Sequence, residues 1–350
     1  MGGLIGSSEF IEKGAYNMEE IRPAKVQCKG INQIGIVVRD AEAVARNYWN
    51  ILGIGPWAVI EWEAPVVYDR KYHGKPVVTK EKLAFAQAGG IQIELLETME
   101  GPSIYKDWLG ERGEGLHHMN FLVDSVDETS ALLAAQGYPS IQSAKCGPEE
   151  LKGGYNYFDI KPLCAILEPV QQVKVKVKPL MIPDNKEHSP AKVQCKGINQ
   201  IGIVVKDVEA VARNYWNILG IGPWAILEWE APAVYDRLYH GKPVVAREKL
   251  AFAKAGGVQI ELLQTIEGPS IYQDWLEEHG EGLHHMNFLV DNLDETTAAL
   301  AGQGFSSLQS ARCGAEELKG GYNYFDVKPL CAILEPVHEV KVKVKAVMIP

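Results

Sequence analysis

Two adjacent histidines, His117 and His118, lie in a short apolar stretch from residue 115 to residue 123, and the same stretch returns at 282–290. In an extended chain successive side chains point to opposite faces, so only one histidine of the pair is expected to face a given site. His118 shares its face with Asn120. Histidine is a common metal ligand where it has partners, but a lone histidine on a strand is more often structural. The stretch therefore predicts a metal site only if other ligands lie on neighbouring strands.

Candidate ligands are the polar residues on stretches that otherwise have the pattern of apolar strands. Gln33 begins one such strand, Glu94 lies within a second, and Glu168 ends a third. Each residue taken alone has an ordinary structural explanation, since a strand-end glutamate is usually solvated. Together with His118 they offer two carboxylates, an amide oxygen and an imidazole nitrogen. Such donors suit a divalent ion such as Zn²⁺, Ni²⁺, Co²⁺, Mn²⁺ or Fe²⁺ and leave positions for water or substrate oxygens. The second half of the chain repeats the set as Gln200, Glu261, His285 and Glu335.

The chain of 350 residues contains two nearly identical copies of one sequence. Residues from 24 onward recur from 191 onward, and the offset of 167 positions (191 − 24) holds without a gap to the end of the chain. A period this long indicates duplication of a whole domain rather than a solenoid repeat. The sequence predicts a flexible lead-in (1–23), a first domain (24–173), a linker (174–190) and a second domain (191–350).

Within each copy, one pattern of a strand, a helix and three further strands occurs twice. The first module has a strand over 31–38, a helix that begins after Asp40 and stops at Gly53, and a later hairpin. The second module repeats this order, with a strand at 117–123 and a helix at 126–136. The sequence therefore predicts an α+β fold, in which paired βαβββ modules form curved, barrel-like mixed sheets.

This arrangement resembles the vicinal oxygen chelate superfamily over nearly all of the chain outside the lead-in and the linker. The resemblance is carried by Gln33 in Ile-Asn-Gln-Ile-Gly, Glu94 in Ile-Glu-Leu-Leu, the Gly-Leu-His-His-Met run, and Glu168 in Leu-Glu-Pro. The His-His run is most similar to methylmalonyl-CoA epimerase, where the second histidine binds metal, which assigns that role to His118 and His285. The ligand types resemble glyoxalase I instead, which uses a Gln, Glu, His, Glu set, whereas epimerases usually have His at the position of Gln33.

The resemblance implies a metal-dependent isomerase or lyase that stabilises an enolate or enediolate while a proton moves next to a carbonyl. It implies one divalent metal ion per domain and a small-molecule substrate with two neighbouring oxygens. In glyoxalase-like enzymes a metal-bound glutamate takes and returns the proton, which nominates Glu168 and Glu335 as catalytic residues. Epimerases use a further glutamate on the third strand. This sequence has Glu81-Lys82-Leu83 there, with Lys82 and Lys249 near the expected position, so the resemblance does not supply that base, and the departure disfavours an epimerase.

Two alternatives remain open. One is an Fe²⁺-dependent dioxygenase of the same superfamily, but such enzymes usually hold iron with two histidines and one glutamate, which Gln33 and Glu94 fit poorly. The other is a non-catalytic protein of this superfamily that binds small molecules and lacks metal ligands. Four candidate ligands per copy favour the enzyme.

Polar residues in an irregular section, 56–80, and an aromatic residue on a late strand are candidates for holding a substrate. Arg70, Tyr72 and Lys75 crowd the section, and Tyr157 lies on the strand. Arg70 and Lys75 carry the charge needed to clamp a carboxylate, phosphate or thioester tail. An exposed polar loop explains the same residues equally well. The second copy supplies Arg237, Tyr239, Lys242 and Tyr324.

Composition narrows the possible partners and the compartment. The net charge of −10 and the pI near 5.5 argue against a nucleic-acid partner. The six cysteines show no CxxC spacing, so neither a disulfide framework nor a thiolate zinc site is expected. The chain shows neither a signal-peptide pattern nor an apolar run of about 18 residues. We expect a cytoplasmic protein without a membrane partner, whose copies pair as an intramolecular pseudo-dimer that is compatible with further homo-oligomers.

Overall fold

The computed structural model describes residues 3–4, 24, 26–183, 191–342 and 344–350. Of the predicted lead-in (1–23), only the short strand β1 (Gly3–Leu4) is described, and it pairs with β23 (Lys341–Val342). Residues 184–190 of the predicted linker lie outside the described residues. The described part of that linker contains β12 (Leu180–Ile182), which pairs with the first domain.

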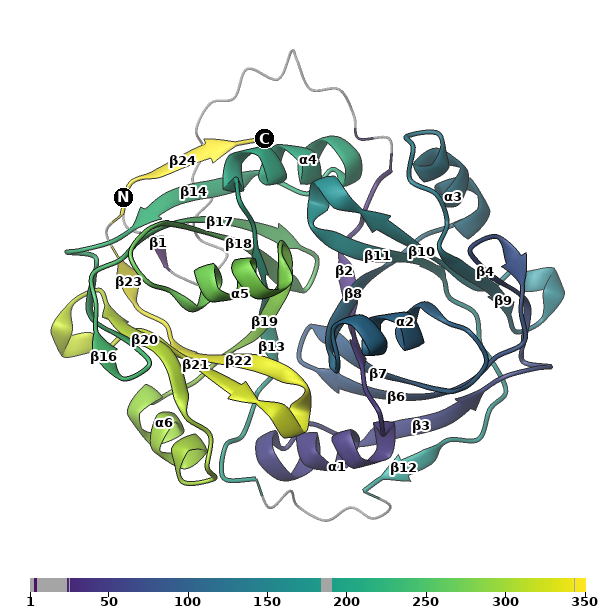
Figure 1. The fold of residues 1–350 in the computed structure, drawn as a ribbon, viewed down its shortest axis with the longest axis horizontal. Helices are drawn as coiled ribbons and strands as arrows, with labels where there is room; N and C mark the ends of the chain where they lie inside the picture. Colours follow the sequence, from purple (N-terminus) through teal and green to yellow (C-terminus); the bar gives the residue numbers. More distant parts are fainter. Residues whose placement is uncertain (1–2, 5–23, 25, 184–190, 343) are drawn as a thin grey trace.

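Each copy forms one curved mixed sheet of eleven strands (Figure 1). The first sheet has the strand order β12-β3-β6-β7-β2-β8-β11-β10-β9-β4-β5, and both of its βαβββ modules come from the same copy. The predicted α+β class with paired modules is confirmed. The elements of the first copy are β2 (Ile31–Val37), α1 (Ala41–Leu52), β3 (Trp57–Trp62), β4 (Val67–Tyr72), β5 (Lys75–Pro76), β6 (Lys80–Ala88), β7 (Ile91–Glu100), α2 (Ile104–Glu111), β8 (Gly115–Leu122), α3 (Val126–Ala134), β9 (Gln142–Cys146), β10 (Gly154–Ile160) and β11 (Ala165–Gln171).

The second copy repeats this arrangement, with its outermost strand contributed by the end of the chain. Its sheet has the order β16-β15-β20-β21-β22-β19-β13-β18-β17-β14-β24. The elements are β13 (Ile198–Val204), α4 (Val208–Leu219), β14 (Trp224–Trp229), β15 (Val234–Tyr239), β16 (Lys242–Pro243), β17 (Arg247–Ala255), β18 (Val258–Glu267), α5 (Ile271–His279), β19 (Gly282–Leu289), α6 (Leu293–Ala301), β20 (Ser307–Cys313), β21 (Gly321–Val327), β22 (Ala332–His338) and β24 (Ala346–Ile349).

The helix after the first strand has the boundaries that its capping residues predict. The side chain of Asp40 accepts a hydrogen bond from the backbone N–H of Ala43, which satisfies one of the free donors at the start of α1. Gly53 ends the helix in the left-handed conformation, at φ 69°. Because apolar residues recur at helical spacing, one side of α1 is buried, including Val44 and Tyr48.

The two copies share one hydrophobic core. A single cluster of buried side chains contains Ile34 and Phe121 of the first copy together with Ile201 and Phe288 of the second. Hydrogen bonds between the copies add to this shared core. Tyr48 Oη of the first copy donates to the carbonyl of Leu330 in the second at 3.0 Å. The equivalent bond from the second copy runs from Tyr215 to Leu163, also at 3.0 Å.

Glycines allow the backbones of the two copies to cross closely. A Cβ atom on Gly90 would lie 2.4 Å from the carbonyl oxygen of Gly257, and one on Gly30 would lie 2.6 Å from Cα of Gly256. The copies therefore form an intramolecular pseudo-dimer.

The described helices are all too short or too polar to cross a membrane. The six cysteines are free, which agrees with the expected lack of a disulfide framework.

Candidate metal centre

Four neighbouring strands bring the predicted ligands of the first copy together. The strands β7, β2, β8 and β11 are adjacent in the sheet, and they carry Glu94, Gln33, His118 and Glu168 respectively. His118 Nε2 lies 3.5 Å from Glu94 Oε2 and 3.3 Å from Glu168 Oε2. Donor atoms of these three residues lie within 4.8 Å of one another, a spacing at which one divalent ion can contact all of them.

The second copy holds the same cluster. His285 Nε2 lies 3.3 Å from Glu261 Oε2 and 3.2 Å from Glu335 Oε2. All three side chains are buried, and their donor atoms are again within 4.8 Å of one another. Each copy therefore contains one candidate metal site.

Two of the donor atoms fit a cation because they lack other partners. Glu94 Oε2 and His118 Nε2 are shielded from water and make no well-directed hydrogen bond within the described residues. Burying charged groups without a partner is costly, and coordination to a metal is one of the ways that proteins remove that cost. The amide nitrogen of Gln33 donates to Gln92 Oε1 at 2.8 Å, which leaves the amide oxygen of Gln33 as its ligand atom.

The protein surroundings shift the pKa values of His118 and Glu94 upward. Burial alone would lower the pKa of His118, but its contacts with the Glu168 and Glu94 carboxylates outweigh this effect and raise the pKa to about 9. Burial raises the pKa of Glu94 to about 7, against the opposing contact with His118. The metal-free cluster therefore retains protons near neutral pH that a cation would displace.

A glycine makes room for each ligating imidazole. Gly35 on β2 pairs with His118 on β8, and a Cβ atom at Gly35 would lie 2.0 Å from Cε1 of the ring. A Cβ atom at Gly202 would lie 1.9 Å from the ring of His285. A larger residue at these positions would displace the imidazole from the carboxylates.

A β-bulge places both histidines of the pair near the site. The pairing of β2 with β8 shifts by one residue beyond Gly35, and His117 is the extra residue. Its Nδ1 lies 3.0 Å from Nδ1 of His118, and His284 and His285 repeat the contact at 3.0 Å. The expected strict alternation does not hold here, because alternation fails at a bulge.

Asn120 and Tyr157 hold the first copy's cluster from two sides. Asn120 Nδ2 donates to Glu168 Oε2 at 3.0 Å. The ring of Tyr157 lies 5.0 Å from the ring of His118, and its hydroxyl accepts from Tyr105 Oη at 2.7 Å. The sequence analysis missed the role of Asn120, although its position two residues after His118 on the same strand face was a usable signal.

In the first copy the cluster opens into a cavity of about 410 Å³. Its wall is apolar and polar in nearly equal parts, with Trp62, Leu83 and Phe85 on the apolar side and amide side chains such as Gln92 and Asn120 on the polar side. Among the described residues that line it there is no arginine or lysine.

The equivalent cavity in the second copy is much smaller, at about 30 Å³. It is lined by Gln200, Glu261 and Glu335 of the second cluster, by His338 at the end of β22, and by Glu339 and Val340 directly after it.

The structure does not bring the predicted charged substrate residues of the first copy to the cavity. Arg70 lies on β4, where its Nη1 pairs with Glu81 Oε1 at 2.6 Å and both side chains are buried. Tyr72 donates to Asp107, and Lys75 is exposed on β5. These three residues occupy strands rather than an irregular loop. Of the four predicted substrate residues, Tyr157 alone lines the cavity.

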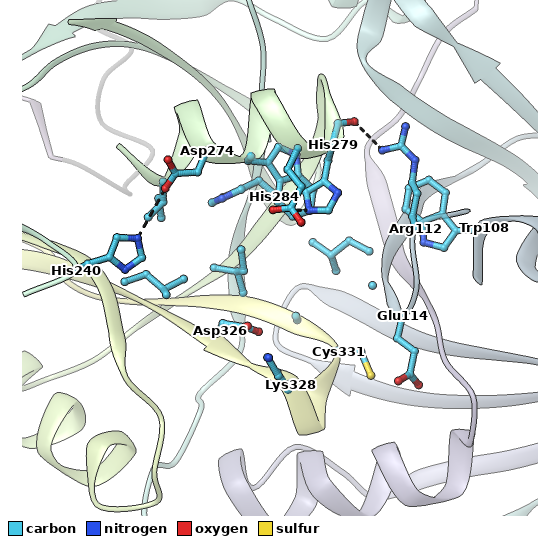
Figure 2. A pocket seen from close by; sticks show the side chains of 18 residues that line it. Trp108, Arg112, Glu114, His240, Asp274, His279, His284, Asp326, Lys328 and Cys331 are labelled. Atoms are coloured by element: carbon cyan, nitrogen blue, oxygen red, sulfur yellow. Dashed lines mark hydrogen bonds and ion pairs between the residues drawn. The ribbon is translucent and has the colours of Figure 1, made fainter. Parts of the chain in front are cut away.

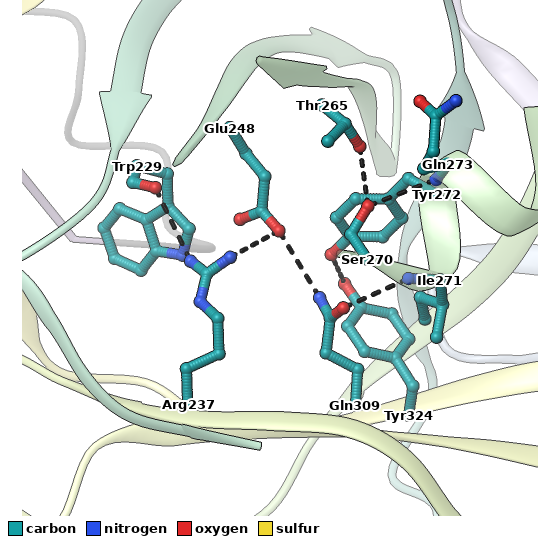
Figure 3. A network of polar contacts seen from close by, with 10 residues as sticks. All are labelled: Trp229, Arg237, Glu248, Thr265, Ser270, Ile271, Tyr272, Gln273, Gln309 and Tyr324. Carbon is teal, nitrogen blue, oxygen red and sulfur yellow. Dashed lines mark hydrogen bonds and ion pairs between the residues drawn. The ribbon is translucent and has the colours of Figure 1, made fainter. Parts of the chain in front are cut away.

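The second copy shows the same placement in detail (Figure 3). Arg237 Nη1 pairs with Glu248 Oε1 at 2.5 Å, and Gln309 Nε2 approaches the same oxygen at 3.5 Å. The Gln309 side-chain oxygen accepts from the backbone N–H of Ile271 at 3.1 Å, at the start of α5. Tyr324 lines the small cavity, whereas Tyr239 and Lys242 do not.

Glu81 is the buried carboxylate that the sequence did not assign. It lies on β6 with the same parity as Leu83 and Phe85, which line the cavity, so its side chain belongs to the same face of the sheet. The pKa of Glu81 is raised by burial, and the contact with Arg70 opposes this shift. Strand alternation in the sequence could have indicated that Glu81 lies on the cavity face of the sheet. No pattern in the sequence indicated that it pairs with Arg70.

A larger cavity, of about 530 Å³, lies between the two copies (Figure 2). The first copy contributes Trp108, on α2, and Arg112, which directly follows α2. The second copy contributes Trp275, His279 and His284. It borders His284 but none of the predicted metal ligands.

A family profile matches both copies. The profile of the Glyoxalase/Bleomycin resistance protein/Dioxygenase superfamily matches residues 32–157 and 199–322. The chain belongs to this superfamily. The predicted resemblance is thereby confirmed, and each copy carries one domain of the Glyoxalase/Bleomycin resistance protein/Dioxygenase superfamily.

Individual relatives within this superfamily are distant. The uncharacterized protein YqjC of Bacillus subtilis (strain 168) is 32% identical over 108 residues, which span 30% of this chain and 66% of that protein. A variant of 4-hydroxymandelate synthase from Streptomyces coelicolor has a TM-score of 0.55 at 13% identity, covering 90% of this chain and 94% of that one. The Mn(II)-bound glyoxalase from Novosphingobium aromaticivorans has a TM-score of 0.46 at 14% identity, covering 89% and 82%. The similarity to the synthase establishes a shared fold and leaves the reaction open.

Proposed function

We propose that the chain is a metal-dependent isomerase or lyase that moves a proton next to the carbonyl of a small molecule with two neighbouring oxygens. The observation that carries this proposal is the buried cluster of Glu94, His118 and Glu168 beside a cavity large enough for a substrate. A divalent ion bound there would act as a Lewis acid, which polarises substrate oxygens and stabilises developing negative charge.

The ligands of each ion come from the four central strands. Gln33 supplies an amide oxygen, His118 an imidazole nitrogen, and Glu94 and Glu168 supply carboxylate oxygens. This set leaves coordination positions for substrate oxygens. Gln200, Glu261, His285 and Glu335 provide the same set in the second copy.

The proton is exchanged by the buried carboxylates. We assign Glu168 and Glu335 as the residues that take and return it, with Asn120 orienting Glu168 through a 3.0 Å hydrogen bond. Glu94 is a second buried carboxylate beside His118, and in the metal-free cluster burial raises its pKa to about 7.

The cavity wall favours a substrate without net charge inside the cavity. An anionic group would find no arginine or lysine among the lining residues, and Arg70 is already paired with Glu81. Tyr157 and the apolar side chains of the wall would hold the body of the substrate, while the amide side chains would donate hydrogen bonds to its polar groups or accept them from those groups. The different cavity volumes lead us to expect turnover chiefly in the first copy.

Metal content measured per chain, followed by an activity screen, tests the proposal. We expect about two divalent ions per chain in the wild type and fewer in the His118→Ala/His285→Ala variant. The Glu168→Gln/Glu335→Gln variant should retain a measurable part of the metal and lose proton exchange, monitored as loss of deuterium from the carbon next to the carbonyl in labelled 2-oxoaldehyde hemithioacetals. The exposed pair Glu150→Gln/Glu317→Gln serves as the matched control.

Other outcomes would redirect the assignment. Bound iron with substrate-dependent oxygen uptake would replace the isomerase or lyase with a dioxygenase of the same superfamily. A protein that takes up no metal even after reconstitution would be a small-molecule-binding member without metal chemistry.

A further inference from the structure

We propose that His117 and His284 are positioning residues that set the tautomer of the metal-binding histidine beside each of them. His117 accepts a hydrogen bond at Nδ1 from Nδ1–H of His118, which leaves Nε2 of His118 unprotonated for the metal. His284 does the same for His285. This inference rests on the metal binding in the proposed function and adds a partner that orients the ligand.

The geometry of the pair leaves only two arrangements of the shared proton. The two Nδ1 atoms are 3.0 Å apart, so one nitrogen must donate and the other accept. His118 Nε2 faces Glu94 and Glu168 at 3.5 and 3.3 Å, which makes it the ligand atom. A neutral imidazole that binds metal through Nε2 carries its proton on Nδ1. His118 is therefore the donor and His117 the acceptor.

The β-bulge is the structural feature that makes this contact possible. In a regular strand the side chains of residues 117 and 118 would point to opposite faces of the sheet. The one-residue shift in the pairing of β2 with β8 turns His117 toward its neighbour, and the pairing of β13 with β19 shifts in the same way at His284. Bulges commonly redirect a side chain next to a functional site.

An aromatic enclosure holds the outer side of His117. The Trp108 ring lies 5.0 Å from its ring at 85°, and the Tyr105 ring lies 5.5 Å away at 76°. His117 Nε2 is buried and has no conventional hydrogen-bond partner within the described residues. An N–H directed at an aromatic face is a weak but real interaction, and such a contact would accommodate a proton on Nε2.

The group that accepts the second N–H of each metal-binding histidine is of an unusual type. Metal-binding histidines commonly donate their second N–H to a carboxylate, a carbonyl or water, and loss of that partner typically costs about 10–100-fold in metal affinity. Here a second imidazole takes that place. Its ring packs against Tyr105 and Trp108 of α2, and in the second copy His284 borders the cavity between the copies (Figure 2).

Two substitutions separate positioning from packing. His117→Phe/His284→Phe keeps a ring in the enclosure and removes the acceptor, whereas His117→Asn/His284→Asn places an amide oxygen near the position of Nδ1 and removes the ring. With Zn²⁺ as the probe in calorimetric titrations, we expect the Phe variant to bind about 10–100-fold more weakly and the Asn variant to stay within a few-fold of wild type. The reverse order would show that the histidines only fill space and would overturn the proposal.

NMR of the wild-type chain gives an independent readout that requires no variant to fold. In the ¹⁵N-histidine-labelled, Zn²⁺-loaded protein, we expect His118 and His285 to be protonated at Nδ1, and His117 and His284 at Nε2. A proton on Nδ1 of His117 or His284 would overturn the proposal. Failure of the wild type to bind Zn²⁺ would instead reject the proposed function, so the two failures are distinguishable.

Discussion

At the scale of single residues, His118 and Glu94 make the metal-free fold sensitive to pH. The folded pKa of His118 is about 9, against an ordinary value of 6.5, and that of Glu94 is about 7, against 4.5. Both groups bind protons more tightly in the folded state. Their contribution to stability is therefore present at low pH and is lost as pH rises through about 7 and then about 9.

We expect the thermal unfolding midpoint of the metal-free protein to fall between pH 6 and pH 9 by more than in the His118→Ala/His285→Ala variant. Excess Zn²⁺ should reverse this trend, because the ion replaces the protons of the cluster. Thermal unfolding at several pH values, with a chelator or with Zn²⁺, measures both effects. Parallel pH curves for the wild type and the variant would contradict the expectation.

The space that Gly35 leaves for His118 is also testable. Gly35→Ala/Gly202→Ala should displace both imidazoles and weaken Zn²⁺ binding by at least about 10-fold, comparable to losing an orienting partner. Gly115→Ala/Gly282→Ala is the matched control, because it changes the strand of the histidines at positions where a Cβ atom meets nothing within 4 Å. Equal affinities for the two variants would show that the imidazole adjusts without loss.

The alternation of side chains along a strand allowed the ligands to be predicted from the sequence. The same alternation predicted that His117 points away from the site, although it contacts the ligand His118. Glu94 and His118 are polar residues on apolar strands, and these strands flank β2 in the sheet, which is near enough for their side chains to meet. The role of His117 was not predictable, because a bulge depends on how two distant strands pair and leaves no mark in a single strand's pattern.

At the scale of elements, a buried ion pair ties β4 to β6. Arg70 and Glu81 are both almost fully buried, with side-chain exposures of 5% and 1%. Their pairing across the sheet could not be derived from the sequence, because nothing local links a charge on one strand to a charge on another. The same contact explains why Arg70 is not available to a substrate.

Removing one partner of this pair should destabilise the fold. We expect Arg70→Met to lower the free energy of unfolding by about 3–5 kcal/mol, because Glu81 is left as an unpaired buried charge. Arg70→Met/Glu81→Leu should recover most of the loss. Urea denaturation measures both variants, with the exposed Lys75→Met as control. A double variant no more stable than the single one would argue against the pair as the cause.

At the scale of the whole molecule, the copies are parts of one folding unit. The largest cluster of buried side chains draws on both copies, and hydrogen bonds such as the one from Tyr48 to Leu330 cross between them. The repeat made two domains predictable from the sequence. Their shared core was not, because an offset between copies carries no information about how they pack.

We therefore expect the full chain to unfold in one cooperative transition rather than in two. Differential scanning calorimetry should give a calorimetric enthalpy equal to the van't Hoff enthalpy for the whole chain. Two resolved transitions, or a calorimetric enthalpy near twice the van't Hoff value, would show that the copies unfold independently.

Joining the copies in one chain also frees them from symmetry. In a homodimer of identical subunits, every substitution appears on both sides of the two-fold axis at once. Here positions 112 and 279 are equivalent in the repeat but hold different residues, and Arg112 Nη1 donates to the backbone carbonyl of His279 at 3.0 Å. Such a contact can be optimised on one side of the pseudo-two-fold axis without placing the same residues on the other side. The same freedom lets two sites with identical ligands keep cavities of different size, so that one copy can change its specificity while the other preserves the shared scaffold.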